Sequence, residues 1–207
     1  AECAAALARI GRQAAAQALV AAAADPDSRV RTRVHEALGE LPGVWSAEAL
    51  HAGLGDRSDY AAAAAAAALG RTRVPEAFDA LVGALERDSH RDVVRREVMV
   101  GLQSLGDPRG AAVARPYTDY AWGKGIQHRL RHAALDALVA LAPHAEETRA
   151  TVVALLSDPY FRMRIWAADH AAELGLTEAV PVLSGAVEQA TGPGVRAAFE
   201  RALARLR

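Results

Sequence analysis

The sequence predicts an all-α protein, an α-solenoid in which helical hairpins stack on one another in chain order. Composition is the first reason: of 207 residues, 51 are alanine and only ten are aromatic, and a chain rich in Ala, Leu, Arg and Glu favours helix over strand. The second reason is an internal repeat with the length of a helical hairpin. Such a unit cannot bury its apolar face alone, so neighbouring copies must stack.

Six segments of the chain share one template: an acidic turn, an apolar anchor usually followed by Arg, and a Leu or Ala eight residues after the anchor. The anchors are Val30, Ala61, Val94, Leu130, Met163 and Val195. Their spacings are 31, 33, 36, 33 and 32 residues. Within a segment, apolar residues fall at offsets 0, 4, 7, 8 and 11 from the anchor. These offsets form one stripe on a helix of about 3.6 residues per turn.

A shorter apolar segment precedes the anchor helix, and we expect it to be the first helix of each hairpin. Examples are Gln13–Ala24, Pro75–Glu86 and Glu146–Leu156. Asp-Pro pairs mark several of the joining turns, because proline suits the first turn of a helix and stops the helix before it. We therefore expect a partial repeat at residues 1–11, followed by six repeats at 12–43, 44–74, 75–107, 108–142, 143–175 and 176–207.

The repeat resembles the short bacterial form of the HEAT repeat over essentially the whole chain. An Asp in the turn and an Arg after the anchor carry this resemblance, as in the pairs Asp25/Arg31, Asp88/Arg95 and Asp158/Arg164. The resemblance implies a ladder of Asp–Arg bonds between successive repeats, for which the planar guanidinium fork is well suited. Ala62 stands in the place of the Arg in the second repeat, so we expect the ladder to be interrupted there.

The chain begins in the middle of a repeat. Residues 4–11 match the end of a second helix, with Leu7 and Ile10 aligned to Leu38 and Leu41. A solenoid normally starts with a polar capping unit. We therefore expect this chain to be a fragment of a longer protein.

Charge and composition exclude several classes of function. The 24 basic and 25 acidic residues leave a formal net charge of −1, which argues against a nucleic-acid partner. The longest uncharged stretch, Gln13–Ala24, is far shorter than the ~20 residues that span a bilayer, so we expect no membrane partner. The single cysteine, Cys3, cannot form an internal disulfide framework.

Motifs for catalysis or metal binding are absent or incomplete. The nearest match to the zinc-peptidase pattern begins at His35, but Gly39 stands where the second histidine should be. His128 and His132 are four residues apart and could clamp a metal, although a solvated surface is the favoured interpretation. His170 falls at an apolar offset, where we expect a packed, hydrogen-bonded side chain. We assign no catalytic, metal-binding or cofactor-binding residue to this chain.

A protein or peptide is the partner that the surface pattern favours. In the second helices, offsets 2, 5 and 6 lie opposite the apolar stripe and are expected to face outward. In three adjacent repeats they include an apolar strip with a mixed-charge rim, which is typical of a docking surface. Its residues are Arg96, Met99, Val100, His132, Leu135, Asp136, Ile165 and Asp169. The alternative is that these side chains pack against first helices in a tightly curved solenoid.

Two further segments depart from the template. Residues 117–125 hold Tyr120, Trp122 and Lys124, the only lysine. These side chains either recognise a partner, as aromatic residues in loops often do, or fill the gap left by a longer turn. The run Ala61–Ala68 is interpreted as close helix packing in preference to a trough for a partner.

The second half of the chain supports a narrower resemblance. GLQSLGDPR at 101–109, YTDYAWG at 117–123 and DPYFR at 158–162 resemble the C-terminal HEAT-like region of bacterial aminopeptidase-N-like zinc metallopeptidases. The resemblance spans 56–207 and implies that a parent enzyme holds its zinc motif upstream, while this region caps or supports the catalytic domain.

The function hypotheses are therefore a non-catalytic domain of such an enzyme and, as the alternative, a free-standing scaffold that binds a peptide or helix on its concave face. A HEAT-like enzyme acting on DNA bases, or a bilin lyase, is a third class. For base chemistry we would expect a basic groove with a catalytic carboxylate, and the net charge of −1 and the mixed-sign face count against it.

Overall fold

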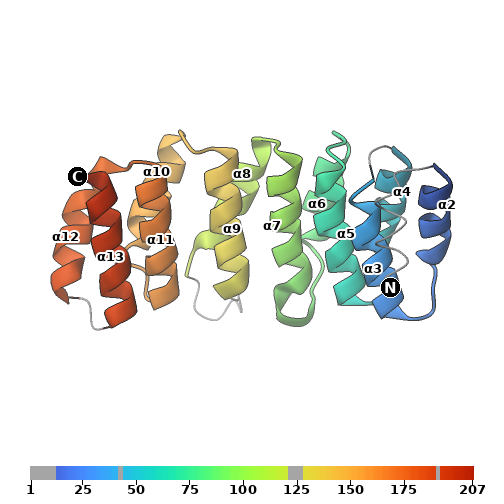
Figure 1. Cartoon of the computed structure of the whole chain (residues 1–207), viewed down its shortest axis with the longest axis horizontal. Coiled ribbons are helices and arrows are strands. Elements are labelled where there is room, and N and C mark those ends of the chain that lie inside the picture. Colours follow the sequence, from blue (N-terminus) through green and yellow to red (C-terminus); the bar gives the residue numbers. More distant parts are fainter. Residues whose placement is uncertain (1–12, 42–43, 121–127, 190–191) are drawn as a thin grey trace. The chain divides into compact units, whose positions relative to one another are not determined.

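The computed structural model describes residues 13–41, 44–120, 128–189 and 192–207. Within these ranges the chain forms α-helices and short 3-10 helices, with no strand, which confirms the all-α prediction. The chain divides into two compact units, residues 1–113 and 114–207. Each unit is described by itself (Figure 1).

The first unit contains three successive helix pairs. The helices are α2 (Gln13–Ala22), α3 (Ser28–Leu38), α4 (Val44–Gly53), α5 (Asp59–Arg71), α6 (Ala77–Ala84) and α7 (Val93–Leu105), with η1 (His90–Asp92) before α7 and α8 (Arg109–Ala114) at the unit's end. In each pair the two helices contact each other, and the second helices α3, α5 and α7 lie side by side in chain order (Figure 1).

The second unit repeats the same arrangement. Its elements are η2 (Arg115–Thr118), α9 (His128–Leu141), α10 (Glu146–Leu155), α11 (Phe161–Glu173), η3 (Thr177–Ala179), α12 (Val180–Gln189) and α13 (Pro193–Leu206). The second helices α9, α11 and α13 contact one another in order. Stacked hairpins of this kind are an α-solenoid, as the sequence predicts. None of the described helices has the length and apolar character needed to cross a bilayer.

Aspartates in four turns shape the entry into the helices that follow. A side-chain oxygen of each aspartate accepts a hydrogen bond from the backbone N–H two residues further on, at 2.8–2.9 Å. Asp25, Asp56 and Asp158 precede the second helices α3, α5 and α11, and Asp107 precedes the first helix α8. This local ring replaces a backbone turn and is the reason that Asp is favoured there.

The prediction that offset 5 faces outward is wrong in five of the six second helices, and it holds for the exposed Glu200 of α13. The residues at this offset in five second helices are all buried: His35, Ala66, Met99, Leu135 and Ala168. Two contacts show the reason. The Nδ1–H of His35 donates to the carbonyl of Ala61 on the next second helix, at 2.9 Å, and Leu135 shares one apolar core with helix α11. Offset 5 therefore meets the following repeat.

Helix α5 lies in the core of the first unit, between α3 and α7. Its alanines from 61 to 68 are at most 8% exposed, apart from the half-buried Ala64, which confirms close packing. The α5 and α7 backbones approach each other at two glycines. A Cβ on Gly70 would overlap the backbone of Gly101, and a Cβ on Gly101 would lie 2.6 Å from the carbonyl oxygen of Ala66.

Bonds between Arg and Asp link successive repeats, as the HEAT resemblance implies. The buried guanidinium of Arg31 binds both carboxylate oxygens of Asp56 in the next repeat, at 2.6 and 2.8 Å. Arg131 binds both oxygens of Asp158 in the same way, and this pair is also buried.

The interruption expected at Ala62 is present, because a methyl group cannot form the next rung. Arg87 connects these two repeats instead: it donates to Asp59 at 2.9 Å and to the Leu54 carbonyl at 3.3 Å. Asp88, the acceptor that this rung would use, pairs with Arg95 of its own repeat at 2.7 Å.

Candidate functional site

Aromatic and titratable side chains gather on helices α9 and α11 of the second unit. We call this surface the α9–α11 face. Its residues are His128, His132 and Asp136 on α9, with Tyr160, Phe161, Trp166, Asp169, His170 and Glu173 on α11 and at its start. Ring contacts and hydrogen bonds connect all of these side chains except Asp169. The Oδ1 of Asp169 lies 3.9 Å from Nη2 of Arg201 on α13.

The aromatic part of the α9–α11 face is a continuous series of ring contacts. His132 stacks on Trp166, with ring centroids 3.8 Å apart and planes at 15°. The ring centroid of Tyr160 lies 6.5 Å from that of Trp166, 5.2 Å from that of His128 and 5.4 Å from that of Phe161. Phe161 is 47% exposed, although apolar rings are normally buried. The series therefore ends at an apolar side chain that is open to a partner.

A buried ion pair holds these rings in place. Arg131 of α9 binds Asp158 in the turn before α11 and donates to the Thr118 carbonyl at 2.8 and 3.0 Å. The same Asp158 accepts the backbone N–H of Tyr160 at 2.8 Å. Because Tyr160 and Phe161 come two and three residues after this aspartate, the ion pair anchors the backbone that carries both rings beside α9.

The polar part of the face centres on His170. Its Nε2 lies 2.9 Å from Asp136 and its Nδ1 lies 3.2 Å from Glu173, which confirms the prediction of a packed, hydrogen-bonded histidine. Burial disfavours the imidazolium, but the hydrogen bonds to these two carboxylates outweigh it and raise the pKa of His170 above its ordinary value.

The two histidines of α9 behave differently from His170. Burial lowers the pKa of His132, against the opposing charge of Asp136. Burial and the neighbouring Arg129 and Arg162 lower the pKa of His128. Both shifts favour the neutral imidazole, and both rings make aromatic contacts with α11 or the residue before it. Within the described ranges, no three His, Cys, Asp or Glu side chains are placed to hold a metal ion.

The predicted apolar strip does not reach the surface as expected. Met99 and Leu135 are fully buried, so the prediction that their side chains are exposed is wrong. Val100 and Ile165 are half-buried. The physical reason is the packing of offset 5 against the next repeat. His132, Asp136 and Asp169 do lie on the surface of the second unit.

The other predicted site residues fall in different places. Arg96 belongs to the first unit with Met99 and Val100, and its Nη2 lies 2.7 Å from Glu97. Tyr120 is 37% exposed, with the Arg131 guanidinium 5.2 Å from its ring centroid. Trp122 and Lys124 lie outside the described residues.

Sequence reasoning missed the aromatic side chains of α11. Tyr160, Phe161 and Trp166 precede or flank the anchor Met163 at offsets that the outward-face rule does not include. One signal could have found them: three of the ten aromatic residues of the chain lie between positions 160 and 166.

Comparison with known proteins identifies the family of this solenoid. The HEAT-repeat profile matches residues 47–122 and 127–204. The chain therefore belongs to the HEAT-repeat family. A search of curated proteins finds no match.

Several solved structures share the fold. The complex of CpcE and CpcF of phycocyanin lyase from Nostoc sp. PCC7120 is 20% identical, over 96% of this chain and 85% of that chain, with a TM-score of 0.57. YIBA of Escherichia coli is 16% identical, over 97% of this chain and 84% of that chain, with a TM-score of 0.61. An engineered protein is 19% identical, over 92% of this chain and 96% of that chain, with a TM-score of 0.55. These similarities concern the fold, because one fold serves many functions.

Proposed function

We propose that this chain is a non-catalytic HEAT-repeat scaffold that binds a protein partner through the α9–α11 face. The observation that carries the proposal is Phe161, an exposed apolar ring at the end of a series of ring contacts that a buried ion pair holds in place. A ring that is held before binding loses little conformational entropy when a partner covers it.

The surroundings of this ring suit a protein partner. Aromatic residues and Arg are enriched in the centre of protein interfaces, and polar groups form the rim. Here Phe161 has the guanidinium of Arg162 5.7 Å from its ring centroid, while Asp169 and Glu173 are exposed on the same helix. These features fit recognition of a partner surface.

A binding comparison tests the proposal. Proteins captured by the chain from the extract of its source cells are identified for the wild type, for Phe161→Ala and for Tyr60→Ala. Tyr60 is the matched control, because it is an exposed ring, 62% exposed, in the first unit. We then expect a purified partner to bind Phe161→Ala about 30-fold more weakly, as for an interface hot spot, and to bind Tyr60→Ala as it binds the wild type.

The proposal is wrong if both ring variants lose the same partners, or if the purified partner does not distinguish Phe161→Ala from the wild type. Circular dichroism of both variants excludes unfolding as the cause. Substitution of the exposed Phe161 removes no core side chain, so both variants are expected to fold.

A narrower proposal concerns the parent protein. The motifs at 101–109, 117–123 and 158–162 support a place in the C-terminal region of an aminopeptidase-N-like zinc enzyme, where the partner is the catalytic domain in cis. The described residues cannot hold the zinc themselves, so the metal site belongs upstream in this proposal. A reading frame with a H-E-x-x-H motif upstream of Ala1 supports it. Zinc-dependent hydrolysis of aminoacyl-arylamides by the isolated chain contradicts the non-catalytic assignment.

A further inference from the structure

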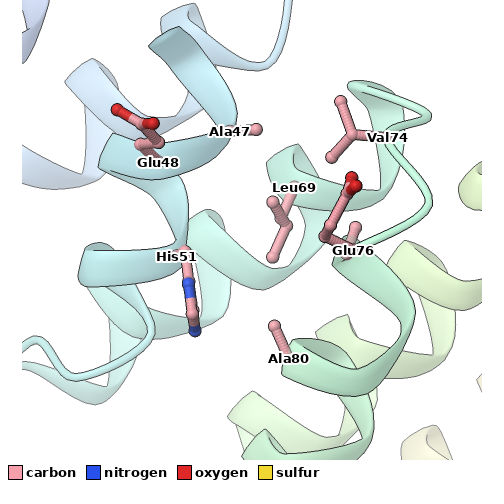
Figure 2. Close-up of a pocket in the computed structure, with 8 residues that line it drawn as sticks. Ala47, Glu48, His51, Leu69, Val74, Glu76 and Ala80 are labelled. Carbon is pink, nitrogen blue, oxygen red and sulfur yellow. The ribbon is translucent and has the colours of Figure 1, made fainter. Parts of the chain in front are cut away.

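A pocket of about 340 Å³ lies between the first helices α4 and α6 in the first unit. Its lining residues are Ala47, Glu48, His51, Leu69, Val74, Glu76, Ala77 and Ala80 (Figure 2). Ligand pockets range from about 300 to 1,000 Å³, so this pocket has room for one side chain or a similarly small group. It is separate from the α9–α11 face, which belongs to the second unit.

Small side chains leave the pocket open. Ala47 of α4 and Ala77 and Ala80 of α6 present only methyl groups, and Leu69 of α5 reaches into the space between these helices (Figure 2). Leu69 is 1% exposed and Ala77 is 2% exposed, so the inner surface is apolar and protected. An apolar cavity of this kind favours an apolar occupant, which removes its own surface and that of the walls from water.

The mouth of the pocket is acidic. Two of the lining residues, Glu48 and Glu76, are exposed carboxylates. Neither Lys nor Arg is found among the described lining residues, and the one basic group is the imidazole of the exposed His51. Carboxylates of one sign beside a low-dielectric wall raise the local concentration of cationic groups.

We propose that this pocket binds one apolar side chain, of the size of Leu or Phe, from a basic segment of a partner protein. The apolar side chain occupies the space against Leu69, Ala77 and Ala80. Lys or Arg residues that flank it in the partner pair with Glu48 and Glu76. The volume, at the small end of the range for ligand pockets, suits one large apolar side chain, and the two carboxylates suit basic neighbours.

Three blocked pentapeptides test the proposal with the wild-type chain. Their sequences are Lys-Lys-Phe-Lys-Lys, Lys-Lys-Ser-Lys-Lys and Glu-Glu-Phe-Glu-Glu. Methyl NMR spectra follow the alanine and leucine signals during titration. We expect the first peptide to bind saturably and to shift the methyl signals of Ala47, Leu69, Ala77 and Ala80. The serine peptide, which lacks the ring, and the glutamate peptide, which reverses the charge, are each expected to bind at least about tenfold more weakly. Burial of Phe and attraction to the carboxylates both contribute to binding.

Variants then locate the site. Ala80→Leu fills the pocket and is expected to abolish the shifts, whereas Ala154→Leu is its matched control, because Ala154 is exposed on the first helix α10 of the second unit. Glu76→Gln is expected to weaken binding about two- to fivefold, as for an exposed charge pair. Glu147→Gln, also an exposed glutamate on α10, should leave binding unchanged.

Each other outcome overturns the proposal. Equal binding of the serine peptide means attraction by charge alone, and equal binding of the acidic peptide means that the mouth does not select cations. Shifts confined to the second unit place the peptide elsewhere. If Ala80→Leu unfolds, the peptide series and the shift map of the wild type still decide the question, and neither depends on partners of the α9–α11 face.

Discussion

Arg31 and Arg131 occupy the same position in two repeats, one residue after the anchor, and each is buried beside the aspartate of the following repeat. A buried guanidinium is tolerated only when its charge and its N–H groups have partners. Both residues meet this requirement with a bidentate carboxylate and a backbone carbonyl. Arg95 has the same place in its repeat but binds Asp88 and Asp92 of its own repeat. These three repeats therefore share an Arg at this position, while its partner depends on the neighbouring repeat.

His35 is a buried residue whose protonation should control stability. Burial lowers its pKa below the ordinary value, and its Nδ1–H donates to Ala61. In the unfolded chain the pKa is about 6.5. As the pH falls below this value, the unfolded state binds a proton that the folded state does not, so the free energy of unfolding decreases. We expect His35→Gln to reduce this decrease between pH 7 and pH 5, measured by urea unfolding followed by circular dichroism.

His170 is the control, because its pKa is shifted in the opposite direction to that of His35. Because its folded pKa is raised, the stability that it contributes is fully present below about pH 6.5 and is lost as the pH rises through the folded pKa. His170→Gln should therefore remove a loss of stability above pH 6.5. If His35→Gln and His170→Gln change the pH dependence in the same direction, the assignment of His35 as a buried neutral side chain is wrong.

Helix α5 shows how a helix whose side chains are mostly methyl groups can form the centre of a unit. The alanines from 61 to 68 have high helix propensity, and their methyl groups let α3 and α7 approach on both sides. The contact between α5 and α7 is closest at Gly70 and Gly101, where backbone meets backbone. Close packing at these positions depends on the absence of a Cβ.

Substitution of the two contact glycines separates helix propensity from packing. Propensity alone predicts that Gly→Ala in a helix stabilises by about 1 kcal/mol. We expect the opposite for Gly70→Ala and Gly101→Ala, with a loss of about 1–3 kcal/mol or more, because the added methyl overlaps the facing backbone. Gly83→Ala in α6 is the matched control, since a Cβ there has no neighbour within 4 Å. Urea unfolding measures all three, and a gain in stability for Gly70→Ala would falsify the close contact.

At the scale of the whole molecule, the helix pairs within each compact unit stack on their neighbours in the chain. Stability in such a solenoid is approximately the sum of the stabilities of the repeats and of the interfaces between neighbours. The two compact units, residues 1–113 and 114–207, are therefore expected to respond separately to a local change.

Arg131→Ala tests this separation. Removal of one partner of a buried ion pair costs about 3–5 kcal/mol, and this pair lies within the second unit. We expect faster amide hydrogen exchange in α9 and α11 and unchanged exchange in α3 and α5, measured by mass spectrometry. The exposed neighbour Arg129→Ala should stay within about 0.5 kcal/mol of the wild type. Equal acceleration in both units would show that the chain unfolds as one cooperative body.

Much of the fold could be predicted without coordinates. The anchor period and the alanine content were enough for stacked helical hairpins. The Arg after the anchor predicted the bonds of Arg31 and Arg131 to the next repeat and the interruption at Ala62. Arg95 and Arg164 bond within their own repeats instead. These properties are local: helix propensity and the spacing of apolar residues act within a few turns of the chain.

The proposed binding surfaces could be recognised only in the tertiary structure. The burial of Met99 and Leu135, the ring series from His132 to Phe161 and the pocket between α4 and α6 all arise where one repeat meets the next. A second helix packs one face against the first helix of its own hairpin and another face against the following repeat. The apolar stripe alone therefore cannot show whether a residue outside it contacts a neighbouring repeat or faces solvent. Only the stacking of successive hairpins decides that difference.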